Sequence, residues 1–137
     1  MQHVLIDTGP LVAAMNRRDK HHEWAYSLLA RLPPPLLTCE AVLAEACFLL
    51  QSVHKGDVAL LAMIQRGVLQ PEFRLGEHAS SIARLMAKYE DVPMSLADAC
   101  LVRMSELYDD CQVATCDGDF HIYRRNGRRT IPLLAPA

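Results

Sequence analysis

The sequence contains no apolar run long enough to span a membrane. Its longest mostly apolar stretch, residues 41–50, is about half the length of a spanning helix. Low-complexity tracts and internal repeats are also missing. The N-terminus has no basic segment, and Asp7 interrupts its first apolar run, so we do not expect a signal peptide. We therefore expect a cytoplasmic protein without a membrane partner, folded as a single domain over residues 1–137.

Cysteine pairs with the spacing of zinc or redox sites are absent. The sequence has five cysteines, an odd number, and no C-x-x-C motif; they are Cys39, Cys47, Cys100, Cys111 and Cys116. Each lies within two positions of an aliphatic residue. We interpret them as small hydrophobic side chains of a protein in a reducing compartment. The six histidines show no ligand spacing either.

An overall excess of positive charge is lacking as well. The formal net charge is -2, which excludes a generally basic nucleic-acid binder. Four arginines nevertheless crowd one segment, and without them 10 of the 14 basic residues remain against 16 acids. Two interpretations are open: RNA binding beside a cation-dependent site, or a solvated turn. The four are Arg124, Arg125, Arg128 and Arg129.

Helical and strand-like patterns alternate along the chain. Short apolar runs predict strands at residues 4–6, 36–38, 68–75, 112–115 and 130–134, with pairs of helices between the first four. Pro71 places the third strand at a sheet edge. The helix at 39–51 is apolar on nearly every side, which predicts that it is buried. Strands separated by helices favour a mostly parallel sheet covered by helices.

Acidic residues interrupt or end several of these apolar stretches. Asp7 ends the first strand and precedes Thr8, Gly9 and Pro10, which favour a tight turn and a helix start, with Thr8 as the cap. In an open α/β sheet, ligands bind at such a corner. Glu45 is the one carboxylate in the run A-V-L-A-E-A-C-F-L-L of the apolar helix. A carboxylate in such a run binds a ligand, pairs with an arginine or faces solvent.

Two further acidic segments have structural alternatives. Ser95 and Asp98 have the spacing of a helix-capping box, which explains Asp98 as well as a ligand role does. Asp117 and Asp119 follow a strand in T-C-D-G-D-F, where D-G is a common turn pair. Together, however, the four segments would bring like charges to one end of the sheet. Oxygen ligands of this kind select Mg²⁺ or Mn²⁺.

Four motifs resemble those of PIN domains, and most closely those of VapC-type ribonuclease toxins from prokaryotic toxin–antitoxin pairs. They are L-I-D-T-G-P-L-V-A, T-C-E-A-V-L-A-E, S-L-A-D-A and T-C-D-G-D-F, in this order. The resemblance implies a three-layer α/β/α sandwich with a central, mostly parallel sheet of about five strands. It also implies an endoribonuclease that uses Mg²⁺ or Mn²⁺.

The resemblance also assigns roles to individual residues. It makes Asp7, Glu45, Asp98 and Asp117 the catalytic, metal-binding acids. Asp119 is a further metal-binding candidate of lower rank, and Thr8 and Thr115 support the site. The implied partners are an RNA substrate, a cognate antitoxin and a second copy of the chain, for which the apolar helices at 25–32 and 58–64 offer a face.

Two alternatives remain open on the sequence. A phosphotransfer enzyme of the haloacid dehalogenase kind also ends its first strand in Asp, but it needs D-x-D, and Gly9 replaces the second acid. A non-catalytic module with the PIN fold would instead use the acidic pocket to hold an arginine from a partner. Metal-dependent cleavage of RNA separates this module from the enzyme.

Overall fold

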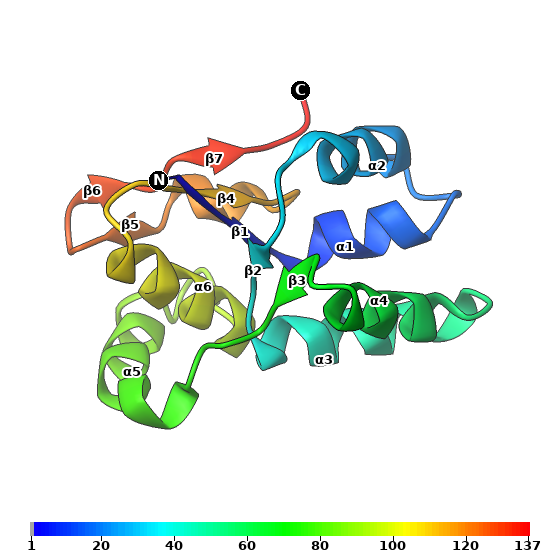
Figure 1. Ribbon diagram of the computed structural model, residues 1–137. Helices are drawn as coiled ribbons and strands as arrows, with labels where there is room; N and C mark the ends of the chain where they lie inside the picture. Colours follow the sequence, from blue (N-terminus) through cyan, green and yellow to red (C-terminus); the bar gives the residue numbers. More distant parts are fainter. Residues whose placement is uncertain (1) are drawn as a thin grey trace.

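The computed structural model describes residues 2–137, which form a central parallel sheet covered by helices on both faces (Figure 1). The sheet has the strand order β3-β2-β1-β4-β7, and β5 and β6 form a separate antiparallel hairpin. The strands are β1 (His3–Ile6), β2 (Leu36–Leu37), β3 (Leu69–Gln70), β4 (Cys111–Ala114), β5 (Arg124–Arg125), β6 (Arg129–Thr130) and β7 (Leu133–Leu134). The predicted five-stranded, mostly parallel sheet is confirmed.

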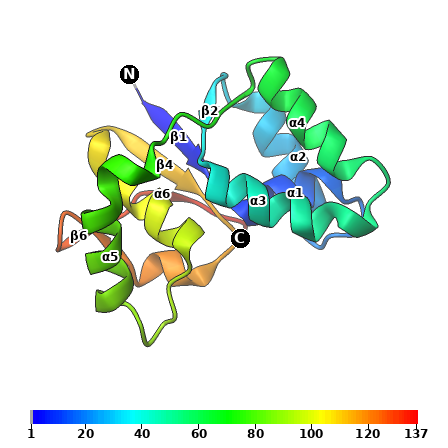
Figure 2. The same ribbon diagram turned by 90° about the horizontal axis from the view of Figure 1, so that it is seen from below.

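Six helices connect these strands within the described residues. They are α1 (Thr8–Met15), α2 (His22–Arg31), α3 (Glu40–Leu49), α4 (Gly56–Gln65), α5 (Ala79–Lys88) and α6 (Leu96–Leu107). Helices α1 to α4 lie on one side of the sheet and α5 and α6 on the other (Figure 2). None of the helices in residues 2–137 combines the length and apolar character needed to cross a lipid bilayer.

The direction of the connections reverses at β1. The chain first builds outward from β1 to β2 and β3, and then returns to place β4 on the other side of β1. In the register of this central pair, Leu5 lies beside Val113 and Ile6 beside Ala114. A crevice forms at the carboxyl ends of two strands where the winding direction reverses. Asp7 follows β1 directly, so it stands at this crevice.

The core consists of aliphatic side chains from both central strands and from the helices against them. Leu5, Ile6 and Val113 are fully buried, as are Leu101 and Val102 of α6. The fully buried strand residues explain why β1 and β4 have continuous apolar sequences instead of alternating ones. The strands therefore hold their carboxyl ends in fixed positions.

The boundaries of several elements differ from the prediction. Asp7, not Thr8, is the N-cap of α1, because its carboxylate accepts from Thr8 N at 2.8 Å. The predicted strand at 130–134 is divided by Pro132 into β6 and β7, and the β5–β6 hairpin was not predicted. Pro71 does follow an edge strand, as expected.

Helix α3 is not buried on all sides, contrary to the prediction. Val42, Leu43 and Ala46 face the core, whereas Phe48 is 67% exposed. Glu45 is also on the exposed side. When the outer face of a helix is apolar too, its sequence does not indicate which face packs against the core. The sequence pattern therefore predicted burial on every side.

Candidate active site

The four main acids predicted from the sequence line one cavity at the reversal point of the sheet. Asp7 follows β1, Glu45 belongs to α3, Asp98 to the first turn of α6, and Asp117 follows β4. The cavity has a volume of about 310 Å³, and its lining also includes Thr8, Gly9, Val12, Asp19, Leu49 and Cys116. Four separate segments of the chain therefore bring carboxylates to the same place.

Asp7 is the most tightly held of these acids. It is 5% exposed, its Oδ1 accepts from Thr8 N at 2.8 Å, and its Oδ2 accepts from the Thr115 hydroxyl at 2.8 Å. Burial raises the pKa of Asp7 to about 7, and the charges of Asp98 and Asp117 add to this effect, while the two hydrogen bonds oppose it. The protein thus holds a carboxyl whose ionised form is strongly disfavoured without a cation.

Thr115 connects two of the acidic segments. Its hydroxyl oxygen donates to Asp7 and accepts from Asp117 N at 2.9 Å. Asp117 in turn accepts from Asp119 N at 2.9 Å, which closes a tight turn after β4. Asp119 does not line the cavity. Its backbone therefore shapes the turn, while its side chain lies outside the group of four.

Asp98 has two structural partners. Its backbone N–H donates to Ser95 Oγ at 3.0 Å, so the predicted helix cap exists. Its carboxylate oxygen Oδ2 accepts from the hydroxyl of Tyr123 at 2.8 Å. Burial raises the pKa of Asp98 and the Tyr123 hydrogen bond lowers it. Capping and a place in the acidic cavity are therefore compatible.

Glu45 is the least restrained of the four. Burial raises its pKa, and the nearby negative charge of Asp98 raises it further. Among residues 2–137, neither of the two ion pairs involves Glu45. The explanation of Glu45 by a buried salt bridge therefore finds no partner in the described part of the chain.

Thr8 contributes a further oxygen atom to the cavity. Its hydroxyl is buried, makes no hydrogen bond of good geometry within residues 2–137, and is close enough to Glu45 to lower the pKa of that carboxyl against the larger effect of burial. A buried hydroxyl without a partner costs free energy unless a ligand or water satisfies it. Together with the four carboxylates, it completes a set of oxygen donors of the type that suits Mg²⁺ or Mn²⁺.

The carboxylate oxygens of the four acids do not surround a single point. In the described residues 2–137, no three Asp, Glu, His or Cys side chains are close enough to enclose a metal ion as they stand. Four mutually repelling carboxylates are expected to stay apart until a cation neutralises them. The type of donor therefore fits a divalent cation, and Glu45 is the most exposed of the four acids.

Sequence reasoning missed three residues that shape this site. Tyr123 is fully buried and binds Asp98, but nothing in the sequence around it indicated this contact. Asp19 lies in a polar turn, where an acid is ordinary. Cys116 has a pKa raised to about 11 by burial, followed by the charges of Asp19 and Asp7. It packs against Gly9, where an added Cβ would lie 3.0 Å from Cys116 Cβ.

The four arginines of the C-terminal segment are not equivalent. Arg125 is 4% exposed, and its guanidinium donates to Tyr108 O at 2.7 Å, so a direct RNA contact does not fit its position. Arg124 is half-buried, and its Nη1 donates to three backbone carbonyls. Arg128 and Arg129 are exposed on the β5–β6 hairpin.

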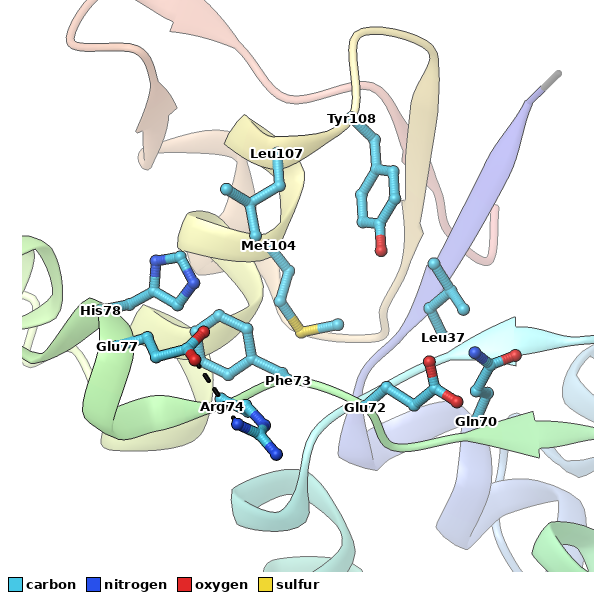
Figure 3. A pocket seen from close by; sticks show the side chains of 10 residues that line it. All are labelled: Leu37, Gln70, Glu72, Phe73, Arg74, Glu77, His78, Met104, Leu107 and Tyr108. Carbon is cyan, nitrogen blue, oxygen red and sulfur yellow. Dashed lines mark ion pairs between the residues drawn. The ribbon is translucent and has the colours of Figure 1, made fainter.

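A second pocket lies apart from the acids, between α6 and the segment that follows β3 (Figure 3). It has a volume of about 130 Å³. Phe73 stacks on His78 there with ring centroids 4.9 Å apart, and Arg74 pairs with Glu77 at 3.6 Å. Arg74 and Glu77 are thus paired with each other, and the pocket contains none of the four acids.

Comparison with known proteins agrees with this architecture. The crystal structure of VapC20 from Mycobacterium tuberculosis, described as a sarcin-ricin loop cleaving toxin, is similar in fold, with a TM-score of 0.79. The two sequences are 24% identical, and the match covers 92% of this chain and 98% of that one. A search of curated proteins found no match. The sequence profile of the PIN domain matches residues 4–126, and the chain therefore belongs to the PIN domain family.

Proposed function

We propose that the protein is a Mg²⁺- or Mn²⁺-dependent endoribonuclease and the toxin of a toxin–antitoxin pair. The observation that carries the proposal is the cavity at the sheet reversal, which is lined by Asp7, Glu45, Asp98 and Asp117. Family membership supports a nuclease, and the likeness to VapC20, a toxin that cleaves the sarcin-ricin loop, supports a toxin that cuts RNA. The proposed enzyme works as one domain in the cytoplasm.

The four acids would hold the metal, and Asp119 stays a lower-ranked candidate. When bound, Mg²⁺ or Mn²⁺ polarises the scissile phosphate and lowers the pKa of an attacking water. The protein's part is to orient these acids. Thr115 and Thr8 N fix both carboxylate oxygens of Asp7, and Tyr123 fixes one oxygen of Asp98. Hydrogen bonds of this kind to ligands typically affect metal affinity or activity 10- to 100-fold.

The proposed partners are RNA, a cognate antitoxin and a second copy of the chain. Exposed apolar side chains on neighbouring helices support protein partners: Phe48 and Leu49 on α3, and Val58 and Leu61 on α4. Exposed apolar groups gathered on one side often mark interaction surfaces.

The deciding experiment is cleavage of RNA by the purified protein after removal of any bound partner. We expect products only with added Mg²⁺ or Mn²⁺, and none from Asp98→Asn. Asp109→Asn serves as the matched control, because Asp109 is exposed and lies outside the acidic cavity. Activity that persists in excess EDTA would overturn the metal mechanism. If no RNA is cut with either metal, the non-catalytic module that holds a partner's arginine becomes the better explanation.

A further inference from the structure

A third cavity, which is basic, lies on the side of the molecule formed by α5, α6 and the β5–β6 hairpin. We call it the basic groove, and its volume is about 310 Å³. Figure 2 shows α5, α6 and β6 together at one side, away from α2 and α4. The residues that line it are Ser81, Arg84, Leu85, Lys88, Arg103, Glu106, Arg124, Asn126 and Gly127.

The groove has an unbalanced positive charge. Arg103 pairs with Glu106 at 3.1 Å, so these two charges cancel. Arg84, Lys88 and Arg124 have no carboxylate partner within residues 2–137. The protein as a whole has 16 acidic and 14 basic residues. The groove is therefore a positively charged region on a protein with a net negative charge. It attracts a polyanion that acidic parts of the surface repel.

Two of the unpaired cations are held in place by the fold. Arg124 Nη1 donates to the carbonyls of His121, Ile122 and Tyr123 at 2.7, 3.1 and 3.1 Å. Lys88 Nζ donates to Gly127 O at 3.2 Å and lies 5.2 Å from the centre of the Tyr89 ring. Carbonyl groups orient these cations without cancelling their charge. Arg124 and Lys88 are thus restrained by the fold, whereas Arg84 is exposed on α5.

The basic groove is connected to the acidic cavity by side-chain contacts through two tyrosines. Tyr123, which donates to Asp98, immediately precedes Arg124. Tyr89, which immediately follows Lys88, accepts from Arg124 N at 3.0 Å and packs against Tyr123 edge to face, with centroids 5.1 Å apart. A chain of contacts therefore runs from an acid of the cavity to the cations of the groove through two tyrosines.

We propose that the basic groove binds the phosphates of the RNA strand next to the cleaved bond. The inference rests on the proposed function and adds to it the path that the substrate takes away from the acids. An RNA strand carries one negative charge per phosphate, so the phosphates beyond the metal site need cations nearby. The groove supplies three of them, and the contacts through Tyr123 and Tyr89 connect it to Asp98. Arg84 and Lys88, on the exposed surface of α5, contact the phosphates farther from the cut.

The test is RNA binding by the double variant Arg84→Gln, Lys88→Gln. Fluorescence anisotropy of a labelled single-stranded RNA is measured in EDTA over a series of salt concentrations, so that binding is read without cleavage. We expect affinity at low salt to fall roughly tenfold, and the slope of log affinity against log salt to fall by about 1.4, or about 0.7 per lost contact. In cleavage assays with metal, the loss should appear in KM.

The matched control is the double variant Arg31→Gln, Arg66→Gln. Both arginines are exposed, near the ends of α2 and α4 on the other side of the sheet, so this variant loses the same charge. It should keep most of the wild-type affinity and slope. Equal losses in both variants would mean that net charge, not the groove, drives binding. An unchanged slope in the groove variant would overturn the proposal, and would favour an acidic protein as the occupant.

The binding and cleavage measurements separate this proposal from the proposed function. If the wild type binds RNA with the expected slope but does not cut it with metal, the nuclease proposal fails and the groove stands. If the wild type cuts RNA and the groove variant binds and cuts as well as the wild type does, the groove fails and the nuclease stands. A wild type that neither binds RNA in EDTA nor cuts it with metal overturns both.

Discussion

Thr115 Oγ1 donates a 2.8 Å hydrogen bond to Asp7 Oδ2 across 108 positions of the sequence. The same oxygen accepts from Asp117 N at 2.9 Å. Because β1 and β4 are neighbours in the sheet, one hydroxyl can hold the acid that follows β1 and the turn that follows β4. The orientation of two proposed metal ligands therefore depends on one side chain that does not itself need to bind metal.

Replacing Thr115 by Val should lower RNA cleavage about 10- to 100-fold, because both contacts that orient Asp7 and Asp117 are lost. Val has nearly the same shape, so the fold should persist. Thr115→Ser keeps the hydroxyl and should recover most of the activity. The measurement is kcat and KM for both variants, with thermal melting as a check of folding. Equal activity of the Val and Ser variants would show that the hydroxyl has no positioning role.

Tyr123→Phe should weaken Mg²⁺ binding about tenfold, because Asp98 Oδ2 loses its hydrogen-bond donor while the buried ring stays in place. The Tyr123 hydrogen bond also lowers the pKa of Asp98, so the acidic limb of the cleavage profile should move to higher pH. The measurements are a Mg²⁺ titration and a pH series. Tyr108→Phe is the control, since Tyr108 lies beside His3 and outside the acidic cavity. Equal effects of the two variants would refute the assignment.

The raised pKa of Asp7 predicts how stability depends on pH in the metal-free protein. The folded state, with a pKa of about 7, holds the proton more tightly than the unfolded state, with a value of 3.8. Asp7 therefore contributes up to about 4 kcal/mol to the free energy of unfolding. This contribution is fully present below about pH 4 and is lost as the pH rises through 7.

Chemical denaturation in EDTA at several pH values measures this effect. In Asp7→Asn the amide oxygen can still accept from Thr8 N, and the variant lacks the titrating proton, so the decline between pH 4 and 7 should be much shallower. The difference between wild type and variant isolates Asp7 from other groups. If both lose stability in parallel, another group is responsible.

Much of the fold follows from the sequence because the signals are local. Residues 4–6 are apolar β-formers directly before Asp7, and the short strand predicted at 112–115 is followed closely by Asp117. The paired helices between strands leave few topologies for a parallel sheet. The convergence of the four acids also follows, since the reversal of winding at β1 brings the ends of two strands together. Contacts across the fold have no such signal. Nothing near Tyr123 marks it as the partner of Asp98, and Arg125 looks like its exposed neighbours although it is buried.

The last prediction concerns Glu45→Gln, which removes a charge and keeps the size and helix propensity of the side chain. Glu45 is on the exposed side of α3 and has no ion-pair partner within residues 2–137, so the substitution strands no buried cation. Its pKa is raised by burial and then by Asp98, which indicates repulsion in the metal-free site. We therefore expect the free energy of unfolding in EDTA to rise slightly, by at most about 0.5 kcal/mol.

The same variant should lose cleavage and most of its response to metal. Mg²⁺ at about 100 times its dissociation constant should stabilise the wild type by about 2.7 kcal/mol. If Glu45 moves inward as a ligand, the variant should gain much less from the same Mg²⁺ concentration. Glu40→Gln is the control, because Glu40 is exposed in the first turn of the same helix and does not line the cavity. The measurements are melting curves with and without Mg²⁺ and one cleavage assay. If the Glu45→Gln variant is stabilised by Mg²⁺ and cleaves RNA as the wild type does, Glu45 is not a metal ligand but a solvent-facing residue of an apolar helix.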